Sequence, residues 1–96
     1  MILTPKQRQE LKAKAHHLDA IIWIGDKGLT ENVLLEIDQA LEHHELIKVK
    51  IAAERDDRKL IATEITGKLH CQLVQQIGRI VVLYRKRKEK KKNKKD

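Results

Sequence analysis

Few side chains in this sequence could act as a catalytic nucleophile. The chain contains no serine, and its single cysteine, Cys71, has His70 as its immediate neighbour. Adjacent residues in a strand or turn do not face each other as nucleophile and base, and catalytic Cys–His pairs are normally assembled from distant positions. We therefore interpret Cys71 as a core or boundary residue.

The five histidines do not have the spacing of a metal site. They occur as two adjacent pairs and one single residue: His16, His17, His43, His44 and His70. Zinc ligands must converge, whereas neighbours on a helix point about 100° apart. We interpret the pairs as helix-end residues that interact favourably with the helix dipole, although His16 or His17 could contact a phosphate. No lysine of the Walker type follows the glycines. The sequence thus predicts a protein that is not an enzyme and uses no metal or cofactor.

One loop has a composition suited to binding. Residues 24–30 read IGDKGLT, and Gly25, Asp26, Lys27 and Gly28 stand between an apolar run and an amphipathic one. Glycines at both ends permit a sharp turn and the close approach of another backbone. The loop enters a helix N-terminus, where free N–H groups and the dipole favour an anion. A GxxG loop clamps the sugar–phosphate backbone in KH domains, but a plain tight turn would explain the glycines equally well.

Charge is concentrated at one end of the chain. The formal net charge is +7, and residues 85–96 hold nine Lys or Arg against two acids, so residues 1–84 are neutral overall. Such a segment repels itself and cannot bury apolar surface. We expect one domain, residues 1–85, followed by a disordered Lys-rich tail, residues 86–96. The tail is either solubilising or an electrostatic arm for nucleic acid or an anionic membrane, and we favour the arm.

The neutral part is also uneven in charge. Its first predicted helix, within residues 4–17, carries four bases, which are Lys6, Arg8, Lys12 and Lys14. Residues 31–45 carry five acids and no Lys or Arg. A domain with this pattern can turn a basic face toward a polyanion and an acidic face away from it.

The composition is typical of a small protein of a reducing compartment. The chain has 96 residues, of which 41% are hydrophobic and 2% aromatic, so a single aliphatic core is expected. One cysteine cannot form an internal disulfide. The first residues lack the apolar stretch of a signal peptide, and no apolar run approaches the roughly 20 residues that span a bilayer. We expect a cytoplasmic monomer with no membrane association.

The first half of the chain predicts three elements. A capping-box pattern at Thr4 predicts a helix that ends near His17. Residues 20–24 form a continuously apolar run, which predicts a strand covered on both faces with Trp23 in the core. Thr30 should cap a second helix.

The middle of the chain predicts a strand and a third helix. Residues 46–52 alternate apolar and basic, so Lys48 and Lys50 should point off the outer face of a strand. Acids at positions 56 and 57 mark the start of the helix. Its expected buried side consists of Leu60, Ile61, Ala62, Ile65 and Leu69.

The last two elements predict a hairpin. Residues 72–77 and 80–84 are strand-like and are separated by Gly78-Arg79, which fits a type II′ turn. The order is therefore α-β-α-β-α-β-β. The first two strands should be parallel with a right-handed crossover, and the last two antiparallel. The predicted fold class is α/β, specifically a two-layer α+β domain with helices packed on a mixed four-stranded sheet.

Taken together, several segments resemble the CRM domain in its stand-alone bacterial YhbY form. They are IGDKGLT at 24–30, LEHHELIKVK at 41–50, IGR at 77–79 and VLYR at 82–85. The resemblance covers residues 2–85. It implies a fold similar to the C-terminal domain of bacterial translation initiation factor three. It also implies RNA binding and association with ribosomal RNA in precursors of the large ribosomal subunit.

The family's RNA-binding loop corresponds to Gly25, Asp26, Lys27 and Gly28. The two inner positions of the family's loop are usually polar or basic, and Asp26 departs from that pattern. An acid beside a phosphate lowers affinity unless it points away or pairs with Lys27. To the loop we add basic residues of the first helix and of the tail's start, which are Lys6, Arg8, Lys12, Lys14, Arg85, Lys86, Arg87 and Lys88.

The resulting prediction is a non-catalytic protein that binds ribosomal RNA and assists large-subunit assembly, with ribosomal proteins as further partners. One alternative is an adaptor whose acidic helix docks basic ribosomal proteins. A small enzyme acting on RNA is a third, disfavoured because no acid–base or metal set is visible.

Overall fold

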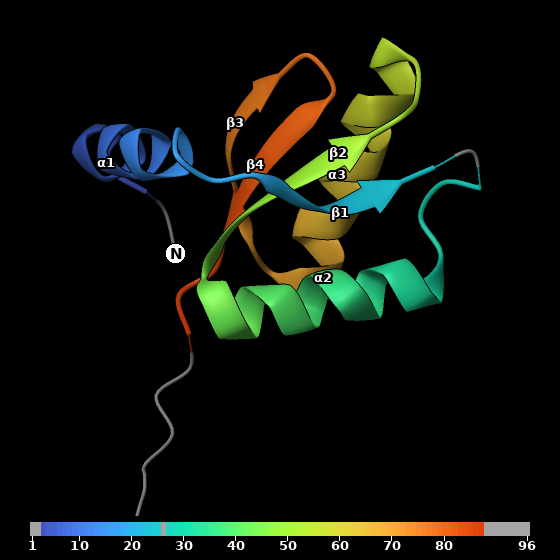
Figure 1. The fold of residues 1–96 in the computed structure, drawn as a ribbon, viewed down its shortest axis with the longest axis horizontal. Coiled ribbons are helices and arrows are strands. Elements are labelled where there is room, and N and C mark those ends of the chain that lie inside the picture. The colour runs from blue at the N-terminus through green and yellow to red at the C-terminus, as the bar shows by residue number, and fades with distance from the viewer. Residues whose placement is uncertain (1–2, 26, 88–96) are drawn as a thin grey trace, which may run out of the picture.

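The computed structural model describes residues 3–25 and 27–87. The elements are α1 (Pro5–Ala15), β1 (Ala20–Ile24), α2 (Glu31–His44), β2 (Leu46–Ile51), α3 (Arg55–Leu69), β3 (Gln72–Ile77) and β4 (Ile80–Tyr84). The strands form one sheet in the order β1-β2-β4-β3 (Figure 1). β1 pairs with β2 in parallel, and the other two pairings are antiparallel. The predicted element order and the mixed four-stranded sheet are therefore confirmed.

Local signals set the start of the first two helices. The Thr4 hydroxyl accepts from the Gln7 amide at 3.1 Å, and the Gln7 side chain accepts from the Thr4 amide at 2.9 Å. The Thr30 hydroxyl likewise accepts from the amide of Val33 at 3.2 Å. Each such cap stabilises a helix by about 1 kcal/mol, so both helices begin where their threonines predict.

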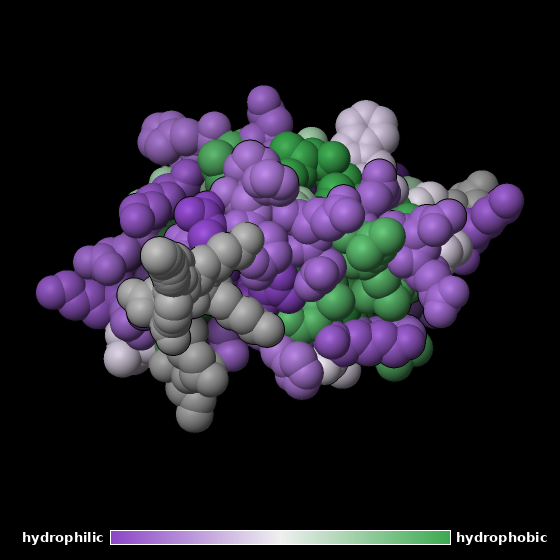
Figure 2. Space-filling model, turned by 90° about the horizontal axis from the view of Figure 1, so that it is seen from below, coloured by the Kyte–Doolittle hydropathy of each residue, from purple (hydrophilic) through white to green (hydrophobic). Residues whose placement is uncertain are grey.

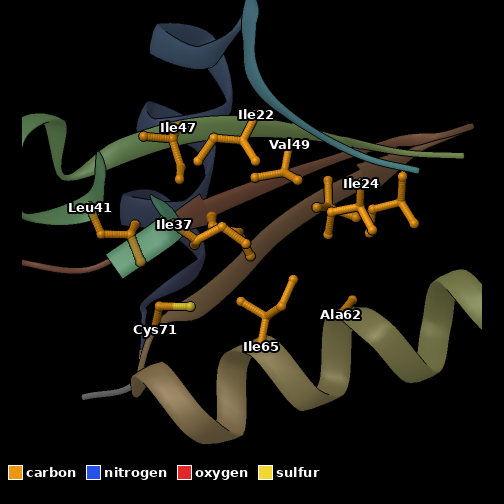
Figure 3. Packing of buried hydrophobic residues seen from close by; sticks show 12 residues of the cluster. Ile22, Ile24, Ile37, Leu41, Ile47, Val49, Ala62, Ile65 and Cys71 are labelled. Carbon is orange, nitrogen blue, oxygen red and sulfur yellow. The ribbon is translucent and has the colours of Figure 1, made fainter. Parts of the chain in front are cut away.

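The main core lies between one face of the sheet and helices α2 and α3 (Figure 3). Alternate residues of β2 point into it, and Ile47, Val49 and Ile51 are buried as predicted. Helix α1 packs on the opposite face, where Ala15 contacts the layer formed by Val82 and neighbouring residues. Helices thus lie on both faces of the sheet, but α1 covers only part of its face.

Three buried positions were predicted wrongly. Trp23 is 71% exposed and Ile21 is 52% exposed, so β1 is covered on one face only. The reason is tertiary: β1 is an edge strand, and α1 packs against β2 and β3 instead of covering it. Leu60 is 68% exposed on α3, whose buried side is formed by Ala62 and Ile65.

Gly67 offers a test of helix stability. It lies inside α3, where an added Cβ would meet no atom within 4 Å. Gly67→Ala should raise the free energy of unfolding by about 0.5–1 kcal/mol, because glycine loses more backbone entropy than alanine in a helix. Thermal unfolding should show a melting temperature several degrees higher.

The matched control is Gly78→Ala in the β3–β4 turn. Gly78 has φ +56°, which alanine adopts only with strain. The same chemical change should therefore destabilise the protein at Gly78. Equal effects at the two positions would contradict the assigned backbone conformations.

Candidate nucleic-acid interface

The GxxG loop leaves β1 as a closed turn. The amide of Gly28 donates to the carbonyl of Gly25 at 3.0 Å, and Gly28 has φ +72°. The backbone at Gly25 is outside the left-handed region, and an added Cβ there would meet nothing within 4 Å. The turn therefore requires glycine at position 28 but not at position 25. Lys27 is exposed, while Asp26 lies outside the described residues.

Two backbone amides at this point already have partners. The Gly28 amide is bonded within the turn, and the Val33 amide is bonded to the Thr30 cap. Neither of these two amides is free to bind a phosphate. What the described part of the loop offers is the Lys27 ammonium and an unobstructed approach to Gly25.

Backbone hydrogen bonds bring the hairpin turn to the same end of the sheet as the loop. The Ala52 amide donates to Ile24 at 2.9 Å, and the Ile51 amide donates to Arg79 at 2.7 Å. The exposed side chain of Arg79 therefore lies at the end of the sheet from which the GxxG loop leaves. Sequence reasoning did not select Arg79, although its place in a two-residue turn between strands signals exposure.

An uncovered row of side chains crosses the sheet beside the loop. Register pairs Trp23 with Lys50, Lys50 with Ile80, and Ile80 with Ile77, one residue from each strand. The Lys50 ammonium lies 5.4 Å from the centroid of the Trp23 ring, within cation–π range. Ile77 is 60% exposed. We call these four residues the open row.

Helix α1 lies away from the GxxG loop. In Figure 1 the helix is at the left of the molecule and the loop between β1 and α2 is at the right. The structure therefore does not bring the basic residues of α1 together with the loop. Lys6 and Lys14 are exposed and Lys12 is half-buried. The Arg8 guanidinium donates to two carbonyls of β3, at 2.7 and 3.0 Å, and so ties α1 to the sheet.

Arg85 also has intramolecular partners. Its guanidinium donates to the carboxylates of Asp38 at 2.7 Å and Glu42 at 3.3 Å, and to the backbone carbonyls of Leu69 and Asp38. The side chain of Arg85 is only 17% exposed. It therefore links the end of β4 to α2 and to the last residue of α3. We call this set of contacts of Arg85 with Asp38, Glu42 and Leu69 the structural clamp.

The following residues continue along α2. The Arg87 side chain donates to two carbonyls at the end of α2, and its amide donates to the Glu45 carboxylate at 2.7 Å. Lys86 is exposed. The described chain thus extends two residues beyond the expected domain boundary. Lys88 and the expected disordered tail beyond it lie outside the described residues.

The α2 side of the molecule is largely hydrophilic. Figure 2, which views this side from below, shows hydrophilic side chains over most of the surface with apolar groups between them. Asp38, Glu42 and Glu45 accept hydrogen bonds from Arg85 or Arg87. Three of the five acids that mark this segment are therefore engaged within the chain.

Cys71 is unsuited to nucleophilic chemistry. It is buried, and its sulfur points into the core toward Ile65 (Figure 3). Burial raises the pKa of the Cys71 thiol to about 11, although nearby Arg85 partly opposes the rise, so the thiol stays protonated near pH 7. Within residues 3–25 and 27–87, no three His, Cys, Asp or Glu side chains are grouped to hold a metal ion. Nor does any helix in that part have the length and apolarity to cross a membrane.

Comparison with known families is decisive for classification. The model of the CRS1 / YhbY (CRM) domain matches residues 3–85. The chain belongs to the CRM domain family. This CRM domain is 51% identical to an RNA-binding protein of Haemophilus influenzae over 93% of its length and 91% of the relative's. It is 45% identical to a probable RNA-binding protein of Pseudomonas aeruginosa, covering 97% and 90% of the two chains.

A solved structure supports the same fold. The solution structure of a Staphylococcus aureus protein, named as a candidate RNA-binding protein, superposes on this CRM domain with a TM-score of 0.79. The two sequences are 40% identical, and the match covers 97% of this chain and 98% of the other. The CRM domain therefore has the fold of that structure over nearly its whole length.

Proposed function

We propose that this CRM domain is a non-catalytic RNA-binding protein that binds ribosomal RNA in precursors of the large ribosomal subunit and assists their assembly. The observation that carries the proposal is the loop after β1, where Lys27 is exposed and Gly25 is a glycine that the turn does not need. Relatives named as RNA-binding proteins support RNA as the partner. The family resemblance implies the ribosomal target, which is part of the proposal.

The loop geometry suggests how a phosphate would be held. A lysine binds phosphate as a compact point charge, and the absence of a side chain at Gly25 lets the sugar–phosphate backbone approach the turn closely. Arg79 adds a second exposed cation at the same end of the sheet. Lys6, Lys12 and Lys14 would contact RNA that extends to α1, whereas Arg8 and Arg85 primarily hold the fold together.

Gly25→Leu tests the loop directly. The new side chain would point into open space, so folding should be little affected while RNA is blocked. We expect roughly tenfold weaker binding to a ribosomal RNA fragment and to isolated large-subunit precursors, with an unchanged melting temperature. Filter binding and sedimentation with the particles measure the two effects.

Gly67→Leu is the matched control, because Gly67 is likewise unobstructed and has an ordinary backbone conformation. It should bind RNA as the wild type does. If Gly25→Leu bound both RNA and precursor particles like the control, the loop would not be the RNA site. If the wild type bound neither, the proposed function itself would be wrong.

The adaptor alternative has less support from the geometry. The acids that would attract a basic ribosomal protein are partly neutralised by Arg85 and by hydrogen bonds from Arg87. Association with precursor particles should therefore be lost after nuclease treatment. Association that survives complete digestion of the RNA would favour the adaptor.

A further inference from the structure

We propose that the open row, Trp23–Lys50–Ile80–Ile77, is a platform on which an unpaired base of single-stranded RNA stacks beside the GxxG loop. The inference rests on the proposed function. It specifies that the RNA is single-stranded and that Trp23 is the residue on which a base stacks. It assigns a binding role to a tryptophan that the sequence alone places in the core.

Trp23 is the most exposed large apolar residue in the part of the chain that the structure describes. It is the only tryptophan in the sequence, and it is 71% exposed, against 68% for Leu60 and 60% for Ile77. An exposed aromatic ring at an edge strand lacks the burial that normally stabilises it. Every nucleic-acid base has a π-face that can stack on such a ring.

Helix α1 leaves this part of the sheet open. Its contact layer includes Val82 and Val74, so it covers the row beside the open one. Lys48 pairs with Val82 in that neighbouring row, and Lys50 pairs with Ile80 in the open row. The uncovered area therefore includes the end of the sheet that carries the loop, and it extends back along β1 to Ile21, which is 52% exposed.

The charge of this face fits a polyanion. Lys48 and Lys50 both belong to it, and none of the described strand residues that share it is acidic. The Lys50 ammonium already lies 5.4 Å from the Trp23 ring centroid. It can hold the ring in place and at the same time contact a phosphate of a stacked nucleotide.

The open row is continuous with the loop. Trp23 precedes Gly25 by two residues, a distance of roughly 7 Å along an extended strand, and both lie at the end of β1. An RNA backbone at the loop can thus place a neighbouring base over the indole. Stacking on the indole requires a base that is not paired in a duplex. Such bases are reached by RNA-binding proteins in unpaired loops, bulges and ends.

A second copy of the chain is the competing occupant, since an edge strand can pair with another. The lysines argue against it: a symmetric contact would bring the same basic side chains together. We therefore commit to single-stranded RNA and treat self-association as an outcome of the test.

Tryptophan fluorescence provides a direct test, because Trp23 is the only indole in the chain. A single-stranded RNA 12-mer of mixed sequence is titrated into the full-length protein, with the same sequence as a duplex in parallel. We expect saturable quenching by the single strand and much weaker quenching by the duplex. Affinity measured by filter binding should agree with the fluorescence curve.

Variants separate stacking from simple contact. Trp23→Ala should bind the single strand roughly tenfold more weakly, in the range expected for loss of one stacked base, while Trp23→Phe should recover most of the affinity. Leu60→Ala, which removes a similarly exposed apolar side chain on α3, is the matched control and should bind normally. Thermal unfolding should show that all three variants remain folded.

The outcomes distinguish this inference from the proposed function. If the wild type binds RNA in a manner sensitive to Gly25→Leu, but without quenching and with no loss in Trp23→Ala, the stacking platform is wrong and the loop site stands. If Trp23→Ala changes only the oligomeric state in sedimentation equilibrium, the open row is an interface between copies.

Discussion

Arg85→Ala is expected to lower the free energy of unfolding by about 2–4 kcal/mol and the melting temperature by about 10–20 °C. The Arg85 guanidinium makes charge-assisted hydrogen bonds to Asp38 and Glu42 and a bond to the Leu69 carbonyl, and its side chain is only 17% exposed. Removing it leaves a backbone carbonyl at the end of α3 without this donor and two neighbouring acids without a counter-charge. Chemical denaturation followed by circular dichroism measures the loss.

Two variants separate geometry from charge. Lys86→Ala removes the same charge one residue later from an exposed side chain and should change stability by less than about 0.5 kcal/mol. Arg85→Lys keeps the charge but lacks the planar fork, so it should fall between the two. If Arg85→Ala unfolded at the same denaturant concentration as Lys86→Ala, the structural clamp would be refuted.

Truncation after Arg87 is expected to weaken RNA binding on the order of a hundredfold at about 0.1 M salt and to flatten its salt dependence. The cut removes six lysines and two acids. Each RNA phosphate that loses its counter-charge should reduce the slope of log affinity against log salt by about 0.7. The net loss is six lysines minus two acids, or four positive charges, so a total reduction of about 3 is expected. Titrations at several salt concentrations measure the slope.

The position of the cut follows from the structure. Arg87 donates two hydrogen bonds to carbonyls at the end of α2 and one to the carboxylate of Glu45, which caps that helix. A truncation that also removed Arg87 would therefore disturb the folded domain as well as change the charge. A full-length variant with the six lysines beyond Arg87 and Glu89 replaced by glutamine, and Asp96 replaced by asparagine, loses the same net charge and controls for chain length. It should behave like the truncated chain, and selectivity for ribosomal RNA should persist in both. An unchanged salt slope in either variant would show that the tail does not contact RNA.

The order of elements could be derived from local patterns. Thr4 and Thr30 can cap only the residues that follow them, and the alternation around Lys48 and Lys50 fixes which side of β2 is buried. Gly78 supplies the positive φ that the hairpin turn needs. These signals act over a few residues, so the sequence carries them in readable form.

The environment of Trp23 could not be derived in this way. A continuously apolar strand is typical of burial on both faces, and β1 has that composition. Whether a helix covers its second face depends on where α1 docks, and α1 docks over β2 and β3. Leu60 was misplaced for a similar reason, because the rotation of α3 about its axis depends on the packing of α2 and the sheet.

The basic residues show the same division. Their number and clustering are properties of the sequence, which therefore determined the charge, the element order and the resemblance to CRM domains. Only the tertiary structure decided that Arg8 and Arg85 bond within the fold, that α1 lies away from the GxxG loop, and that Trp23 and Lys50 share an open face. Hydrogen-bond partners far apart in the chain become neighbours only when the sheet forms, and that long-range pairing decides which cations remain free to meet RNA.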